Sequence, residues 1–130
     1  MTSFDALAGE SFVSLTTFRT TGVPVSTPVW IARDGAELVV TTPKESGKVK
    51  RIRNSGRVEL TPCDRRGRVT PGAATQSGHA VIQSDAATVE RLGTVFLRKY
   101  RLEYRIFLFI ERLVARGNKP RVILRIAPTA

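Results

Sequence analysis

Alternating apolar and polar positions mark the strands of this chain, because successive side chains of a strand point to opposite faces. This pattern, together with its β-forming residues, predicts six strands over Ser11–Phe18, Pro24–Ala32, Glu37–Thr42, Arg57–Cys63, Gly78–Ile82 and Arg121–Ile126. Asp34-Gly35 is a strong hairpin signal between the second and third strands. Proline cannot donate to a strand ladder, so Pro28 predicts that the second strand lies at a sheet edge or contains a bulge.

Helical spacing marks the remaining ordered segments. A short, very basic helix is predicted within Thr41–Asn54, and a longer one over Asp85–Lys99 with Asp85 as its N-cap or first-turn acid. A second helical run covers Tyr104–Ala115, and a short helical turn is predicted at Asp5–Gly9. Hairpins followed by a helical pair and a closing strand favour a mainly β fold. We expect an antiparallel six-stranded barrel with flanking helices.

Length and composition indicate one domain spanning residues 1–130, with the 42% hydrophobic and 25% charged residues of an ordinary globular protein. The net charge of +10 is unusual and indicates an anionic partner, whether nucleic acid, an acidic membrane or a phosphorylated small molecule. Cys63 is the only cysteine and His79 the only histidine, so an internal disulfide is excluded and no obvious zinc site remains. Without a signal peptide or a membrane-length apolar run, the cytoplasm is the expected location.

The segment from Thr41 to Asn54 carries the groups that bind phosphate: strand-end hydroxyls, N–H groups at a helix start, and several cations. The candidate ligands are Thr42, Ser46, Lys48, Lys50 and Arg51. Helical neighbours point about 100° apart, so not all of these cations can reach one ligand. Thr41 and Thr42 point to opposite faces of a strand, so at most one faces the site, and Thr42 is our choice.

The order of these motifs resembles the pyridoxamine-phosphate-oxidase-like split β-barrels, a superfamily of flavin- and deazaflavin-binding oxidoreductases. The resemblance rests on Pro24–Trp30, Asp34-Gly35, Thr41-Thr42, Ser46–Lys48 and Arg57-Val58. Later segments match the short actinobacterial branch that binds coenzyme F420, namely Cys63–Arg68, Gly78–Ala80 and Lys99-Tyr100. The resemblance therefore implies a split β-barrel of the FMN-binding-protein type and covers almost the whole chain.

The same resemblance implies roles for individual residues. Thr27, Pro28 and Val29 would line the cofactor ring, largely with backbone atoms. Thr42 and Lys48 would hold its phosphate with a contribution from Ser46. Many relatives have a basic residue where this chain has Gly47, and here Lys50 and Arg51 follow instead. The resemblance also implies a homodimer with the cofactor at its interface.

The predicted function is an F420-dependent oxidoreductase that transfers a hydride between reduced deazaflavin and a small organic substrate. The alternative is an FMN-binding oxidase, flavin reductase or cofactor-sequestering protein of the same fold. No catalytic residue is predicted, because the cofactor carries the hard chemical step. A nucleic-acid-binding module is disfavoured, since the chain has no aromatic-interleaved basic strand and no recognition helix.

Three further features have two readings each, and Cys63 has one. The basic amphipathic segment Lys99–Arg116 favours docking on the barrel, with contact to an anionic membrane as the alternative. Trp30 is expected to be a packed aromatic rather than a stacking platform, and His79 a surface or packing residue rather than a proton donor. Cys63 is expected to be an inert, half-buried thiol.

Overall fold

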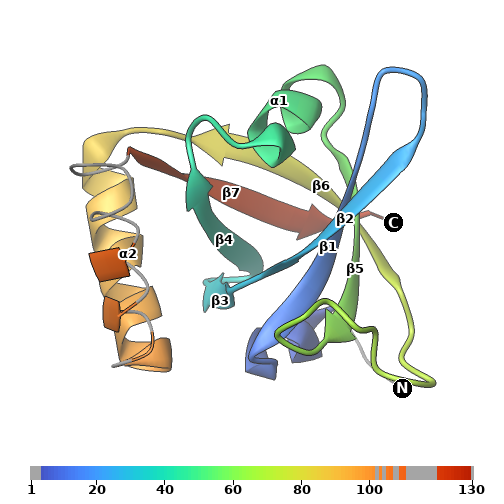
Figure 1. The fold of residues 1–130 in the computed structure, drawn as a ribbon. Helices are drawn as coiled ribbons and strands as arrows, with labels where there is room; N and C mark the ends of the chain where they lie inside the picture. Colours follow the sequence, from blue (N-terminus) through green and yellow to red (C-terminus); the bar gives the residue numbers. More distant parts are fainter. Residues whose placement is uncertain (1–3, 102, 104, 107–108, 111–119, 130) are drawn as a thin grey trace.

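The computed structural model describes residues 4–101, 103, 105–106, 109–110 and 120–129 (Figure 1). Its elements in chain order are the 3₁₀ helix η1 (Asp5–Gly9), β1 (Phe12–Phe18), β2 (Pro24–Val29), β3 (Ile31–Asp34), β4 (Glu37–Pro43), α1 (Gly47–Asn54), β5 (Arg57–Cys63), β6 (Gln76–Gln83), α2 (Ala86–Tyr100) and β7 (Arg121–Pro128). The fold is therefore mainly β, with helices beside the sheet as predicted.

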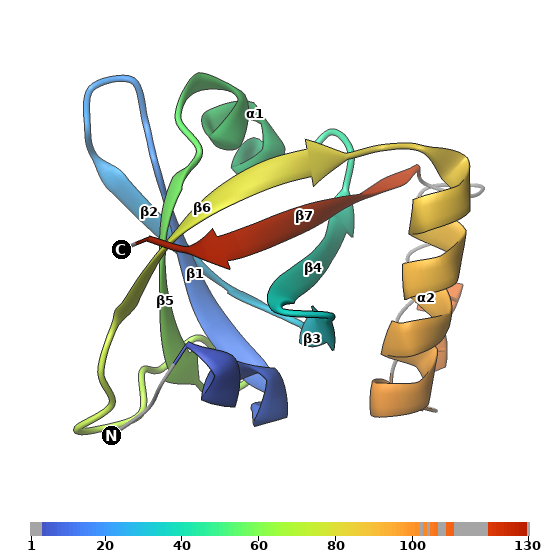
Figure 2. The same cartoon turned by 180° about the vertical axis from the view of Figure 1, so that it is seen from behind.

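The seven strands form one antiparallel sheet with the order β2-β1-β5-β6-β7-β4-β3. The sheet curls upon itself into a half-barrel consistent with a split β-barrel, and β6 and β7 form its back wall (Figure 2). Helix α1 lies over one end of this half-barrel, and α2 runs along its outside (Figure 1). The curled sheet thus leaves its open side available for a site (Figure 1).

The prediction of six strands was wrong, because the segment predicted as one strand over Pro24–Ala32 is divided at Trp30. β2 pairs with β1 at one edge of the sheet, and β3 pairs with β4 at the other edge. One straight strand cannot pair with both edges of a curled sheet, so the chain must bend between them. The edge position predicted from Pro28 is confirmed, since β2 pairs with β1 alone.

Two apolar clusters fill the two faces of the sheet. The larger lies inside the curl and includes Leu15, Leu60 and Leu124. The smaller lies beneath α2, where Leu92 and Phe96 are fully buried. Each fully buried side chain of this size contributes about 1.5–3 kcal/mol, so α2 is held mainly by its apolar face.

Helices α1 and α2 each begin at a residue whose side chain caps the helix. The Asp85 side chain accepts a hydrogen bond from Thr88 N at 3.0 Å, which confirms Asp85 as an N-cap. Ser46 caps α1 in the same way, with Val49 N as the donor. Most of the helical run predicted over Tyr104–Ala115 lies outside the described residues, and those of its residues that are described are helical. No helix in the described part of the chain has the length and apolar character needed to cross a bilayer.

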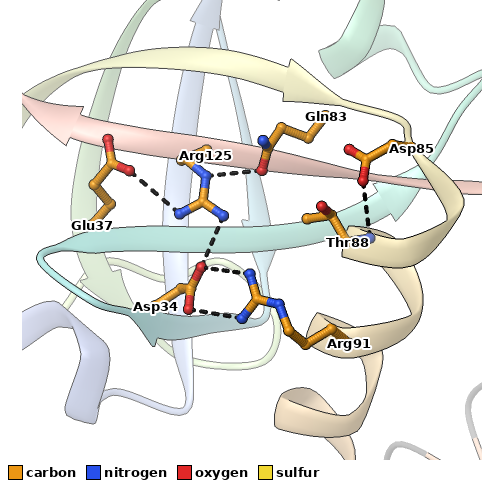
Figure 3. A network of polar contacts seen from close by, with 7 residues as sticks. All are labelled: Asp34, Glu37, Gln83, Asp85, Thr88, Arg91 and Arg125. Carbon is orange, nitrogen blue, oxygen red and sulfur yellow. Dashed lines mark hydrogen bonds and ion pairs between the residues drawn. The ribbon is translucent and has the colours of Figure 1, made fainter.

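A polar network ties α2 to the hairpin between β3 and β4 (Figure 3). Asp34 accepts two hydrogen bonds from Arg91 of α2, at 3.0 and 3.1 Å, and one at 2.8 Å from Arg125 of β7. Arg125 also donates to Gln83 and Glu37, so its guanidinium is bonded in three directions. Gly35 supplies the positive φ of 65° that this hairpin turn requires, which confirms the predicted turn.

Candidate functional site

A pocket of about 440 Å³ opens beside β4, between the α1 loop, the bend at Trp30 and the helical residues that follow α2. One end of it is cationic, the middle is apolar, and an ion pair lies at the other end. These three parts come from segments far apart in the sequence. The pocket is therefore assembled by the curl of the sheet.

The cationic end is built by the last residues of β4, the first residue of β7 and the start of α1. Thr41, Thr42, Lys48 and Arg121 all line the pocket there. Antiparallel pairing of β4 with β7 sets Pro43 opposite Arg121. The Arg121 guanidinium then donates from Nε to Thr41 Oγ1 at 3.0 Å, which fixes its head at the pocket wall.

Lys48 is the electrostatic centre of this end. Burial lowers the pKa of its amine, and the nearby positive charges of Arg51 and Arg121 lower it further. No carboxylate of the described residues forms an ion pair with Lys48. Half-buried cations that repel one another are stabilised when an anion binds between them. The pocket is accordingly suited to a phosphate at this end.

The loop before α1 is ordered by its hydroxyl groups. Thr42 Oγ1 donates to Ser46 Oγ at 3.1 Å, and Ser46 Oγ accepts from Val49 N at 3.4 Å. Ser46 N also donates to Pro43 O at 3.1 Å, which closes the turn. The first N–H groups of a helix have no carbonyl partner within that helix, so the start of α1 adds donors next to Lys48.

The middle of the pocket is apolar. Pro28, Val29 and Trp30 line it at the bend after β2, and Ile106 and Ile110 line it from the helical residues after α2. A mostly apolar pocket with a few polar groups is typical of sites for small molecules and cofactors.

Trp30 stacks on Tyr100 with ring centroids 5.0 Å apart, as expected of a packed aromatic, and it also lines the pocket. Thr27 stands outside the pocket lining, on the inner face of β2, where its Oγ1 is buried without a hydrogen-bond partner among the described residues.

The other end of the pocket is bounded by Phe12, Arg65 and Glu103. Arg65 lies in the loop after β5, and its guanidinium pairs with the Glu103 carboxylate at 2.9 Å. Phe12 begins β1, whereas the Thr17 end of the same strand lies under α1 and bonds to Arg51. The pocket therefore reaches from the cations at the end of β4 to the Arg65–Glu103 pair beside the start of β1.

The structure brings five of the predicted site residues to the pocket: Pro28, Val29, Thr42, Ser46 through its bond to Thr42, and Lys48. Lys50 is exposed on α1 and does not line the pocket. Arg51 points back across the helix start and donates from Nε to Thr17 Oγ1 at 2.6 Å. A Cβ at Gly47 would lie 2.8 Å from Arg51 Nη1, so this guanidinium fills the space beside Gly47.

At the cationic end, Thr41 and Arg121 line the pocket although neither was predicted to. Arg121 stands eighty residues after Thr41, and the pairing of β4 with β7 brings the two together. Thr41 lines the pocket alongside Thr42, although strand alternation predicted that only one threonine would face it. The difference arises because the pocket wraps around the end of β4, where the chain turns into the α1 loop.

The remaining candidates lie away from the pocket lining. Cys63 is buried, and desolvation together with nearby Asp64 and Glu10 raises the pKa of its thiol to about 11, as expected for an inert thiol. His79 is exposed on β6, opposite Arg57 of β5, in the surface position predicted for it.

Comparison with known proteins places this geometry in context. The family model described as pyridoxamine 5'-phosphate oxidase matches residues 3–130. No curated protein matches the chain in sequence. The chain is similar to the conserved hypothetical protein Rv2991 from Mycobacterium tuberculosis, with a TM-score of 0.72 and 22% identity over 100% of this chain and 82% of that one.

Two further solved structures share the architecture. An F420 reductase has a TM-score of 0.64 and 21% identity over 100% of this chain and 96% of that one. A FAD-binding protein from Mesorhizobium loti has a TM-score of 0.64 and 14% identity over 97% of this chain and 84% of that one. At such low identities the likeness to these structures establishes the fold alone.

Proposed function

Because the chain belongs to the pyridoxamine 5'-phosphate oxidase family, we propose that it is an oxidoreductase that holds coenzyme F420 in the pocket beside β4. The reaction proposed is hydride transfer between the reduced deazaflavin and a small organic substrate. The observation that carries this proposal is the cationic end of the pocket, which Lys48 and Arg121 line and where no described carboxylate pairs with Lys48. Burial, and then the charges of Arg51 and Arg121, lower the pKa of Lys48 there.

The residues present fit a phosphorylated ring cofactor. Lys48 and Arg121 would hold the phosphate together with the hydroxyl groups at the end of β4 and the start of α1. Pro28, Val29 and Trp30 would lie along the ring. The pocket places its cations and its apolar wall on successive parts of one slot, in the order in which such a molecule carries its phosphate and its ring.

The exposed cations around the phosphate loop favour F420 over FMN. Lys44, Lys50 and Arg53 are all exposed there, and none pairs with a described carboxylate. Coenzyme F420 carries an oligoglutamate tail beyond its phosphate, whereas FMN ends at the phosphate. A tail of carboxylates would neutralise these cations, which gives them a role that FMN does not. FMN remains the alternative cofactor of the same site.

When bound, the cofactor supplies the hydride chemistry, and the protein supplies binding, orientation and exclusion of water. Lys48 and Arg121 fix the phosphate end and so set the position of the ring along the slot. Trp30, Ile106 and Ile110 surround the middle of the pocket with apolar surface, which keeps water from the reacting face. We assign no catalytic acid, and the substrate is a small molecule that fits between the ring and the Arg65–Glu103 end.

We also propose that a second copy of the chain covers the open side of this pocket. Ile106, Phe109 and Ile110 are 50%, 60% and 53% exposed, which is unusual for neighbouring large apolar residues on one helical face. Light scattering after size exclusion should give twice the 14.3 kDa mass of one chain. A monomer that binds vesicles of anionic lipid would instead favour the membrane contact considered from the sequence.

The proposed function is tested by titrating the purified protein with F420 and with FMN, followed by tryptophan quenching, since Trp30 is the only tryptophan. Lys48→Ala should weaken cofactor binding by about 10- to 100-fold, because a charge-assisted hydrogen bond contributes about 1.5–3 kcal/mol. Arg98→Ala removes one charge at an exposed position of α2, away from the pocket lining and the phosphate loop, and serves as the matched control.

Tighter binding of FMN would make the FMN-dependent alternative the leading one. Binding of neither cofactor, or an equal loss of affinity in Lys48→Ala and Arg98→Ala, would overturn the proposal. Raising the salt concentration should weaken binding in the wild type more than in Lys48→Ala, since screening acts on the charge that the variant lacks.

A further inference from the structure

The wall of the pocket is formed at the bend between two strands. β2 ends at Val29 and β3 begins at Ile31, so Trp30 lies between them. The two strands lead to opposite edges of the sheet. Contacts made at this bend therefore influence the direction of Pro28, Val29 and Trp30 along the pocket.

Lys99, near the end of α2, reaches this bend with its charged head. Its Nζ donates to three backbone carbonyls: Ala8 O at 2.7 Å, Glu10 O at 2.7 Å and Ile31 O at 2.6 Å. An ammonium group has three donors, so every donor of Lys99 is used on the backbone. Burial lowers the pKa of this amine to about 8, so at pH 7 it is still mostly protonated and able to donate all three bonds.

Tyr100, the next residue, holds the same bend from the other side. Its hydroxyl accepts a hydrogen bond from Ile31 N at 3.0 Å, and its own proton has Ser11 O at 2.7 Å and Ile31 O at 3.1 Å as acceptors. Its ring stacks on Trp30 with an interplanar angle of 21°. Both the N–H and the C=O of Ile31 are thus bonded to side chains of α2.

The hydrogen bonds of Lys99 and Tyr100 are not needed to hold α2 against the sheet. The apolar residues Leu92 and Phe96 already bury α2 against the sheet. A lysine amine is costly to desolvate, and an apolar residue could pack in its place at lower cost. The amine is directed instead at carbonyls from η1, from the segment that follows it and from β3. Removing it would leave these carbonyls without their donor.

We propose that Lys99 and Tyr100 are positioning residues for the cofactor site, because they set the bend at Trp30 and thereby the shape of the pocket wall. We call this pair the Lys99–Tyr100 clamp. The clamp reaches the pocket lining through Trp30, on which the Tyr100 ring stacks. The inference rests on the proposed function for its effect on affinity, but its effect on Trp30 is independent of any cofactor.

The test compares Lys99→Met and Tyr100→Phe with Arg91→Met. Arg91 also joins α2 to the β3 end of the sheet, through Asp34, but it lies near the start of the helix and away from the pocket lining. The wild type and each variant are examined at pH 7 for thermal unfolding, for the emission maximum of Trp30 and for affinity toward F420 and FMN.

The clamp predicts that Lys99→Met weakens cofactor binding about tenfold more than Arg91→Met at a similar loss of thermal stability. Tyr100→Phe, which removes one oxygen atom and keeps the stacked ring, should weaken binding about threefold and shift the Trp30 emission of the cofactor-free protein. If Lys99→Met does not fold, the cofactor affinity and Trp30 emission of Tyr100→Phe still test the clamp.

Equal affinities in Tyr100→Phe and the wild type, together with unchanged Trp30 emission, would overturn the clamp even where the cofactor binds. If the wild type binds neither cofactor, the proposed function fails, and the emission of the cofactor-free variants still decides the role of the clamp. Unchanged emission in both clamp variants would then refute it, and a shift absent from Arg91→Met would support it.

Discussion

Replacing Asp34 by asparagine should destabilise the protein, because it removes the charge at the centre of the network in Figure 3. The carboxylate accepts three hydrogen bonds from two guanidinium groups, those of Arg91 and Arg125. An amide of nearly the same shape has only one acceptor oxygen and presents its NH₂ group to a cation. Arg125 is 18% exposed at its side chain, so it would keep its charge with one fewer partner.

The expected loss of stability in Asp34→Asn can be worked out from the lowered pKa of Asp34. Hydrogen bonds from Arg91 and then from Arg125 lower the pKa of this carboxyl from 3.8 to about 2. The difference corresponds to about 2.4 kcal/mol at full strength. Asp34 is 23% exposed at its side chain and Arg91 is 56% exposed, so solvent screening reduces this value. We expect Asp34→Asn to lower the free energy of unfolding by about 1–2 kcal/mol at pH 7.

The pH dependence has a definite sign. Because the folded-state pKa is lowered, the stabilisation is fully present above the unfolded value of 3.8 and is lost as the pH falls through about 2. Urea unfolding of the wild type and Asp34→Asn at pH 7 and pH 3 measures this difference. Asp5→Asn, which removes an exposed carboxylate 3.9 Å from Arg33, is the control and should change stability by less than about 0.5 kcal/mol.

At pH 3 the difference between the wild type and Asp34→Asn should be about half of its value at pH 7. A difference that is the same at both pH values would show that the charge of Asp34 is not the stabilising feature. A loss at pH 7 no larger than that of Asp5→Asn would show that the network contributes nothing beyond an exposed ion pair.

Two further predictions concern single residues near the pocket. Arg121→Gln should weaken binding of F420 or FMN by about tenfold in the same quenching titration, because it removes one of the cations that line the phosphate end; unchanged affinity would remove Arg121 from the site. Cys63 should react slowly with a thiol reagent at pH 8 in the folded protein and quickly after unfolding, since burial raises its thiol pKa to about 11; rapid reaction of the folded protein would contradict this.

Local features of the chain could be predicted because their causes lie within a few residues of one another. The turn at Asp34-Gly35, the cap at Asp85 and the bounds of β5 all match the structure. The divided second strand could not be predicted, since its bend at Trp30 depends on how far the whole sheet curls. Pro28 was the local feature that indicated an irregularity in this strand, because it predicted an edge position or a bulge.

In the candidate site, too, the residues that are close in sequence could be predicted and the distant one could not. Lys48 and the hydroxyls of Thr42 and Ser46 follow one another in the chain, and the structure keeps them together. Arg121 reaches the pocket only through the pairing of β4 with β7, which no local pattern reports. Arg51 shows the converse, because its bond to Thr17 turns it toward β1 and away from the pocket lining.

The most direct test of the central claim is a crystal structure of the protein with F420 bound. We expect the phosphate within hydrogen-bond distance of Lys48 Nζ and the Arg121 guanidinium, with the ring against Pro28, Val29 and Trp30. A phosphate bound elsewhere, or a ring outside the slot between Trp30 and Ile106, would contradict the account.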